Sequence, residues 1–128
     1  MNKINKSTNN SIKNYFLKAL NAFKGLYTVF KEEKSFIAIF IIIVISYVIA
    51  GIYYYKMGLI HWIILILVNA LMIVVEIINT AIENIVDLIN FKYGINAKKI
   101  KNISSAASLV IIISGLIIYL ILFINVIA

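Results

Sequence analysis

Four oxygen-bearing side chains recur at helical spacing in the segment EIINTAIENIVD, residues 76–87: Glu76, Asn79, Glu83 and Asp87. A helix advances about 100° per residue because it has about 3.6 residues per turn, so the four share one face if the segment is helical. Carboxylate and amide oxygens suit Mg²⁺, which usually keeps waters and is shared with substrate phosphates. A carboxylate at a membrane surface could also take a proton from a lipid hydroxyl. This face is a candidate phosphoryl-transfer site; the plainer alternative is that the acids merely face water.

The rest of the chain predicts the helices that must position these residues. The chain has 128 residues, of which 63% are hydrophobic, so it has room for one domain with an unusually apolar composition. Three stretches carry no Lys, Arg, Asp or Glu: residues 35–55, 57–75 and 103–128. Each is about long enough to cross a hydrocarbon core of roughly 30 Å as a helix. We therefore predict an all-α integral membrane protein with spans at about 36–54, 59–80 extending to 91, and 103–127.

The N-terminal region predicts a helix of a different kind. Residues 1–11 are polar and rich in Asn and Lys, which favours a disordered tail. Residues 12–34 place apolar side chains three and four apart with lysines largely between them. This pattern predicts an amphipathic surface helix that lies in the membrane interface or packs on the chain's own spans. The lysine-rich segment 91–102 is predicted to be the loop before the third span.

The charges predict how the chain is oriented in the membrane. The formal net charge is +7 and every basic residue is a lysine. The lysines flank the spans instead of forming one stripe, which argues against a nucleic-acid partner and is typical of topology signals and contacts with anionic lipid heads. Most lie before the first span and in the second loop. The positive-inside bias therefore predicts a cytoplasmic N-terminus, an outward C-terminus, and an acidic motif on the side where nucleotides are.

Two kinase classes are excluded by missing motifs. The sequence contains no GxxxxGK[ST], which excludes a P-loop enzyme of the usual kind. It also contains no HRD or DFG signature, so it is not an ordinary protein kinase.

The acidic motif closely resembles the signature of the prokaryotic diacylglycerol kinase family, which includes undecaprenol kinase. Two further segments agree with the family in order and spacing. Lys24-Gly25-Leu26 followed by Glu33-x-x-Phe36 looks like the N-terminal helix and the start of the first span. Ala97-Lys98 with Lys101, followed by Ser105-Ala106-Ala107, looks like the entry to the third span. The resemblance covers about residues 20 to 125.

The resemblance implies a small kinase of the bacterial cytoplasmic (inner) membrane that passes through it several times. Its relatives work as homotrimers with active sites shared between neighbours, and they use ATP with Mg²⁺ to phosphorylate a lipid alcohol. By position, Glu76 would be the base near the lipid hydroxyl and Asn79 would orient the reacting groups. Glu33 and Glu83 would bind Mg²⁺ with the ATP phosphates. The remaining nucleotide-binding residues would be Asp87 on the nucleotide side, Lys101 on phosphate, and Lys24.

The choice of lipid depends on smaller features. Ser104-Ser105-Ala106-Ala107 looks more like the diacylglycerol branch, whereas Ile78-Asn79-Thr80 is common in the undecaprenol branch. We therefore predict a diacylglycerol kinase that makes phosphatidic acid, with undecaprenol kinase as the alternative. A different class of protein also fits three short spans, namely a non-catalytic membrane protein such as a small pore-former or an assembly subunit.

Overall fold

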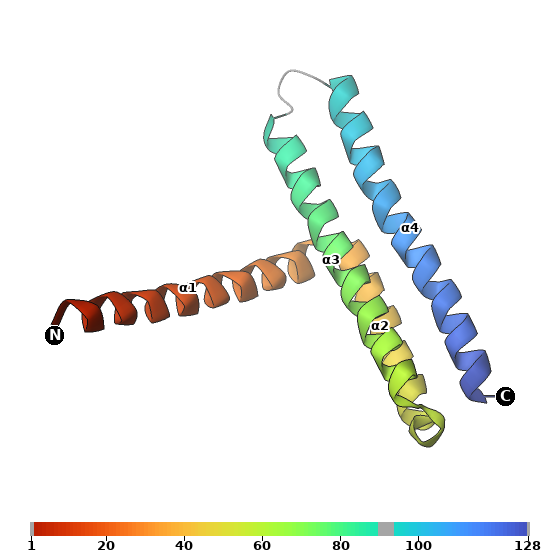
Figure 1. Cartoon of the computed structure of the whole chain (residues 1–128). Coiled ribbons are helices and arrows are strands. Elements are labelled where there is room, and N and C mark those ends of the chain that lie inside the picture. Colours follow the sequence, from red (N-terminus) through yellow and green to blue (C-terminus); the bar gives the residue numbers. More distant parts are fainter. Residues whose placement is uncertain (1, 90–93, 128) are drawn as a thin grey trace. The chain divides into compact units, whose positions relative to one another are not determined.

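The computed structural model describes residues 2–89 and 94–127, with side chains for residues 13–89, 94 and 96–127. It contains four α-helices: α1 (Asn2–Glu32), α2 (Lys34–Ile52), α3 (Leu59–Ile89) and α4 (Gly94–Ile127) (Figure 1). A short 3₁₀ helix, η1 (Tyr54–Lys56), follows α2, and the described residues form no strand. Within the described residues, three segments are long and apolar enough to cross a membrane, namely Lys34–Ile52, Leu59–Ile89 and Asn96–Ile127. The prediction of an all-α integral membrane fold is confirmed.

The helix α1 forms a compact unit of its own, separate from the unit that begins at Glu33. Its large apolar side chains, such as Phe16, Phe23 and Tyr27, are exposed at the surface of the structure. The hydroxyl of Thr28 donates to the carbonyl of Lys24 over 3.0 Å, within the helix. The helix also includes residues 2–11, where composition alone predicts disorder.

Glu33 separates α1 from α2. Its backbone is extended, with φ −105° and ψ 111°, and it is the N-cap residue of α2. The amide of Ile37 donates to the Glu33 carbonyl over 3.3 Å and so closes the first turn of α2. Glu33 is therefore fixed at the start of the first membrane helix, within the second unit.

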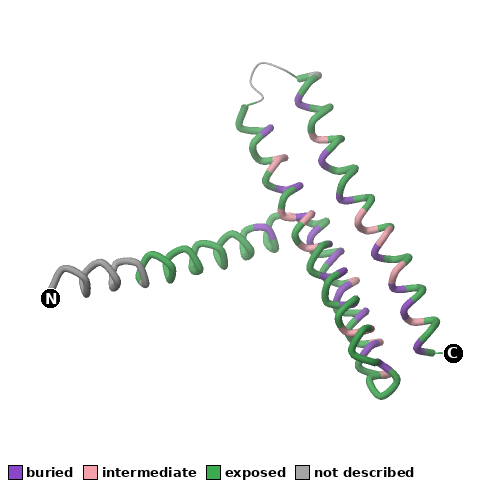
Figure 2. Tube along the Cα trace, viewed as in Figure 1, coloured by how far each residue is buried: buried purple, intermediate pink, exposed green. Residues whose placement is uncertain are grey.

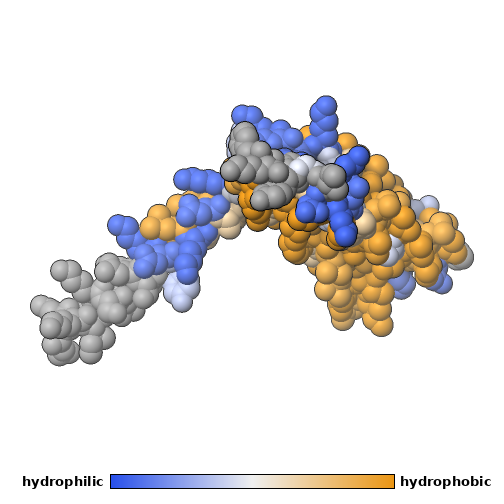
Figure 3. Space-filling model, turned by 90° about the horizontal axis from the view of Figure 1, so that it is seen from above, coloured by the Kyte–Doolittle hydropathy of each residue, from blue (hydrophilic) through white to orange (hydrophobic). Residues whose placement is uncertain are grey.

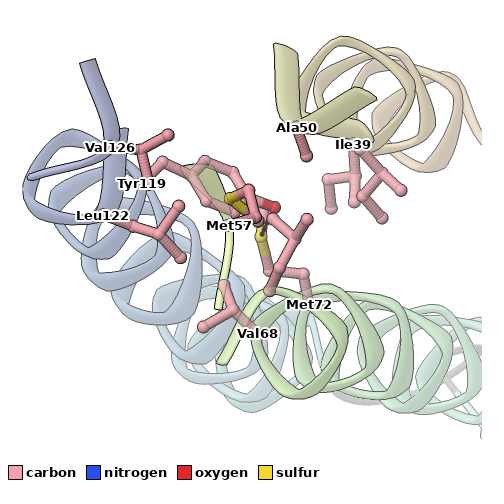
Figure 4. Close-up of a cluster of buried hydrophobic side chains, with 10 residues drawn as sticks. Ile39, Ala50, Met57, Val68, Met72, Tyr119, Leu122 and Val126 are labelled. Atoms are coloured by element: carbon pink, nitrogen blue, oxygen red, sulfur yellow. Dashed lines mark hydrogen bonds between the residues drawn. The ribbon is translucent and has the colours of Figure 1, made fainter. Parts of the chain in front are cut away.

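The three membrane helices pack around a small apolar core. Its members come from all three helices and from the turn after α2; Figure 4 shows Ile39 and Ala50 of α2, Met72 of α3 and Tyr119 of α4 converging on it. Gly115 of α4 lets α3 approach closely, because a Cβ there would lie 2.8 Å from the Sδ of Met72. Small residues at such contacts are typical of helix packing in lipid, where backbones must come close to gain van der Waals contact.

Buried residues follow the facing sides of α2, α3 and α4, and exposed ones cover the outside of these helices (Figure 2). Most exposed side chains on the three helices are large and apolar, as expected where the solvent is hydrocarbon. Figure 3 looks onto the end where α3 and α4 are connected, and shows hydrophilic groups gathered beside that connection, with apolar surface along the helices behind them.

One boundary differs from the sequence-based prediction. The helix α4 begins at Gly94, so residues 94–102 are helical and not a loop. The lysines of this segment are helix-forming residues, and they continue the third membrane helix past its apolar part. The predicted end of the second span at Phe91, and the first residues of the predicted loop, lie outside the described residues.

Candidate active site

The acidic motif forms a stripe on α3 that runs from the interior of the helix bundle toward water. Glu76 is only 1% exposed, and Asn79 and Thr80 are buried beside it. Glu83 is half-buried and Asp87 is exposed. The side-chain amide of Asn79 donates to Oε1 of Glu83 over 3.1 Å, one helical turn along the stripe. The plainer reading, in which all the acids merely face water, is wrong for Glu76.

Glu76 is held by a residue from another helix. The hydroxyl of Ser35, in the first turn of α2, donates a hydrogen bond to Oε1 of the Glu76 carboxylate. A buried carboxylate needs such a donor, because burying a charge without hydrogen bonds costs far more than burying a paired one. Sequence reasoning missed Ser35. Its partner is Glu76, far along the chain, so only the packing of α2 against α3 reveals the contact.

Two residues of α4 contact the acidic side chains of α3. The hydroxyl of Ser105 donates to Oε1 of Glu83 over 3.4 Å. The ammonium of Lys101 lies 2.6 Å from Oδ1 of Asp87. Helix α4 therefore contributes a hydroxyl to Glu83 and an ammonium to Asp87.

The site offers oxygen ligands suited to a hard cation, but its side chains alone do not form a complete coordination sphere. No group of three His, Cys, Asp or Glu side chains that could hold a metal ion occurs among the described residues. Mg²⁺ does not need such a group, since it is usually bound through one or two carboxylates plus substrate phosphates. In the described part of the chain, the buried Oδ1 of Asn79 has no hydrogen-bond partner. This oxygen and the Glu83 carboxylate therefore fit Mg²⁺ that arrives with a nucleotide.

A second polar cluster lies deeper among the spans, and we call it the inner network: Ser46, Asn69 and Tyr119. The Tyr119 hydroxyl donates to Oδ1 of Asn69, and Nδ2 of Asn69 donates to the Ser46 hydroxyl over 3.5 Å. All three residues are buried. Sequence reasoning missed this network too, although a signal existed: Asn69 is a polar residue in an apolar run, about two turns from Glu76 on the same face.

Six of the seven predicted site residues belong to one unit of the structure. The structure places Glu76, Asn79, Glu83, Asp87, Lys101 and Glu33 in the unit formed by residues 33–128. Lys24 belongs to α1, which is a separate unit, so its part in the site remains a prediction. The roles assigned to the other six residues also remain predictions.

An apolar groove of about 460 Å³ lies between α2 and α4. Ser46 and Tyr119 of the inner network line it. Its other lining residues are large and apolar: Ile42, Ile45, Ile49, Leu116, Leu120, Phe123, Ile124 and Ile127. The groove has room for a hydrocarbon chain.

Comparison with known proteins gives two findings. The profile of the family described as prokaryotic diacylglycerol kinase matches residues 20–123. A diacylglycerol kinase of Helicobacter pylori (strain ATCC 700392 / 26695) is 37% identical over 86 residues, which are 67% of this chain and 66% of that protein. The alignment therefore spans just under two thirds of the relative's length. The family that matches is the one that the acidic motif resembles.

Proposed function

Because the chain belongs to the prokaryotic diacylglycerol kinase family, we propose that it transfers a phosphoryl group from ATP to the hydroxyl of diacylglycerol, giving phosphatidic acid. The strongest support for this proposal comes from the contacts and position of Glu76. The buried carboxylate of Glu76 already accepts a hydrogen bond from a hydroxyl group, and it lies on the same helix face as Glu83. A base for an alcohol and a ligand for a nucleotide's metal are thus aligned along one helix.

Glu76 is the base in this proposal. Its carboxylate would take the proton of the lipid hydroxyl as that oxygen attacks the γ-phosphorus, which is general base catalysis. Its burial among membrane helices suits the task, because the lipid carries its hydroxyl at the boundary between hydrocarbon and water. The removal of water from this position also limits the competing hydrolysis of ATP.

Glu83 and Glu33 would hold the nucleotide through its Mg²⁺, which spreads and neutralises charge on the phosphates. Asn79 lies between Glu76 and Glu83 along the helix face. Its side-chain amide donates to Glu83, and its Oδ1 has no hydrogen-bond partner among the described residues. These features suit a residue that orients the base and the metal ligand. Lys101 would contact phosphate, held in place by Asp87. All the basic residues of this chain are lysines, so they bind phosphate as point charges and not as planar forks.

The wider setting is also part of the proposal. The lysine distribution supports a site at the cytoplasmic face of the bacterial inner membrane, where ATP is available. The chain would work as a homotrimer whose active sites are shared between neighbouring copies, as the family resemblance implies. In such an assembly Lys24 of a neighbouring copy would complete the nucleotide site.

The second candidate substrate is undecaprenol. The apolar groove between α2 and α4 suits any long hydrocarbon chain and does not separate the two lipids. The printed name of the Helicobacter pylori relative and the small residues at Ser104-Ser105-Ala106-Ala107 favour diacylglycerol. An apolar site discriminates by only about 1–3 kcal/mol per methylene-sized difference, so some activity on both lipids is expected.

The test sets both lipids in the same detergent micelles with labelled ATP and Mg²⁺. Faster labelling of diacylglycerol supports the proposal, whereas a clear preference for undecaprenol reverses the choice of lipid and keeps the kinase. Labelling of neither lipid by folded protein would support the remaining alternative, a non-catalytic membrane protein.

A further inference from the structure

The hydrogen bond between Ser35 and Glu76 is the same contact that an acceptor alcohol must make with the base. Ser35 is a primary alcohol, its hydroxyl donates directly to Oε1 of Glu76, and its residue is exposed on its other side. We propose that Ser35 is a second phosphoryl acceptor, so that the protein phosphorylates its own Ser35 when no lipid alcohol occupies the site. This inference rests on the proposed function, because it uses the same base and the same Mg-ATP.

The bonds that form and break in this step are of the same kinds as in lipid phosphorylation. The Ser35 oxygen forms a bond to the γ-phosphorus while the bond from that phosphorus to the bridging oxygen of ATP breaks. The Ser35 proton passes to the Glu76 carboxylate, and ADP leaves. Glu33, one of the proposed ligands of the nucleotide's Mg²⁺, is only two positions before Ser35, at the N-cap position of the same helix. The phosphoryl donor and Ser35 are thereby brought to the same end of α2.

The position of Ser35 also suits the product. Ser35 lies in the first turn of α2, where backbone amides lack partners within the helix and the helix dipole favours an anion. Lys34 is its neighbour in that turn. Ser35 is exposed, so there is room for the added phosphate.

Two consequences follow for the enzyme. A lipid hydroxyl and Ser35 compete for one carboxylate oxygen, so the lipid protects Ser35 from phosphorylation. The Oγ of phosphoserine has no proton to donate, and the phosphate adds negative charge beside Glu76, which opposes the approach of ATP. Self-phosphorylation therefore switches the kinase off when its lipid substrate is absent.

The test incubates the purified full chain in detergent micelles with Mg²⁺ and labelled ATP, without lipid and with increasing diacylglycerol. Mass spectrometry of proteolytic peptides locates the phosphate. We expect label on residue 35, at no more than one phosphate per chain, and at a rate that falls as diacylglycerol rises. The Ser35→Ala and Glu76→Gln variants should remain unlabelled, whereas Ser35→Thr should still be labelled because it keeps a hydroxyl.

Tyr47→Phe is the matched control, because it removes a hydroxyl from the same helix at an exposed residue that does not line the apolar groove. It should be labelled like the wild type. Equal labelling of Ser35→Ala and wild type, or phosphate only at another residue, overturns the inference. So does unlabelled protein in a preparation that phosphorylates diacylglycerol, and in that case the proposed function stands. If neither protein nor lipid is labelled, the proposed function fails with it.

Discussion

Lys101 of α4 and Asp87 of α3 form an ion pair across the two helices, with 2.6 Å between Nζ and Oδ1. Both side chains keep access to water, since 34% of the Lys101 side chain and 59% of the Asp87 side chain are exposed. Exposed pairs add little to stability, so this pair is better suited to holding the lysine toward a ligand than to holding the helices together.

If Lys101 contacts a phosphate of ATP, its loss weakens nucleotide use. We expect Lys101→Met to raise the KM for Mg-ATP by about tenfold or more, because a charge-assisted hydrogen bond is lost. Asp87→Asn should raise this KM less. The double variant should resemble Lys101→Met alone, because Asp87 acts through Lys101 and coupled residues are not additive.

Lys99→Met is the control for the loss of one positive charge on the same helix. Its KM for Mg-ATP should stay within about twofold of wild type, as expected for an exposed lysine outside the site. Steady-state kinetics in micelles measure all four variants. Equal effects of Lys99→Met and Lys101→Met would assign the loss to general charge and not to a phosphate contact.

The inner network should stabilise the bundle without taking part in turnover. Tyr119→Phe removes the hydroxyl that donates to Oδ1 of Asn69 in a buried place. Hydrogen bonds between membrane helices contribute about 0.6 kcal/mol on average and up to about 1.7 kcal/mol. We expect a fall in stability within this range and near-normal turnover, measured by thermal unfolding in micelles and by the kinase assay.

Tyr54→Phe is the matched control for the network, because Tyr54 is 68% exposed and lies in η1, outside the inner network. This variant should unfold at the wild-type temperature. If Tyr119→Phe were as stable as Tyr54→Phe, the inner network would have no structural role.

Gly115 provides a separate test of how closely α3 and α4 pack. In Gly115→Ala the new Cβ would lie 2.8 Å from the Sδ of Met72 and 3.3 Å from a methyl group of Val68. Overpacking a close contact typically costs about 1–3 kcal/mol, and the flexible Met72 side chain favours the lower end. Gly51→Ala has nothing within 4 Å of its Cβ and should be neutral or slightly stabilising. Equal unfolding temperatures for the two variants would contradict the packing of α3 on α4.

The sequence was sufficient to predict three membrane helices, because long uncharged runs have few other stable arrangements. It was also sufficient to place Glu76, Asn79, Glu83 and Asp87 on one face, because helical periodicity is local. The contact between Ser35 and Glu76 could not be predicted, since it depends on the register of α2 against α3, which side-chain packing sets.

The inner network could not be predicted for the same reason, because it also depends on how the helices pack. Asn69 is visible in the sequence as a polar residue in an apolar run, but its partner Tyr119 belongs to another helix. The early start of α4 at Gly94 has a different cause. A lysine-rich segment is read as a loop by its polarity, although lysine has good helix propensity and can extend a membrane helix into water.

The orientation of the chain is tested by chemical labelling. The natural sequence contains no cysteine, so single cysteines can be introduced without background. The lysine asymmetry predicts that a membrane-impermeant reagent added outside intact cells labels a cysteine placed after Ala128 but not one placed at Ser7. The reverse pattern would place the acidic stripe on the side without ATP and contradict the proposed function.

The central claim is that the acidic stripe of α3 moves a phosphoryl group from ATP to a lipid alcohol, with Glu76 as base and Glu83 as metal ligand. The substitutions Glu76→Gln and Glu83→Gln keep the shape of each side chain and remove its charge. Both should abolish turnover in folded protein, but for different reasons. Glu76→Gln should retain Mg-ATP binding, whereas Glu83→Gln should weaken it.

The most direct measurement is therefore the transfer of labelled phosphate from Mg-ATP to diacylglycerol in micelles, compared for wild type and Glu76→Gln at matched amounts of folded protein. The account predicts labelled phosphatidic acid with the wild type and a loss of at least about 100-fold with Glu76→Gln, the lower limit for general base catalysis. Wild-type activity in Glu76→Gln, or no transfer to any lipid by the folded wild-type protein, would contradict it.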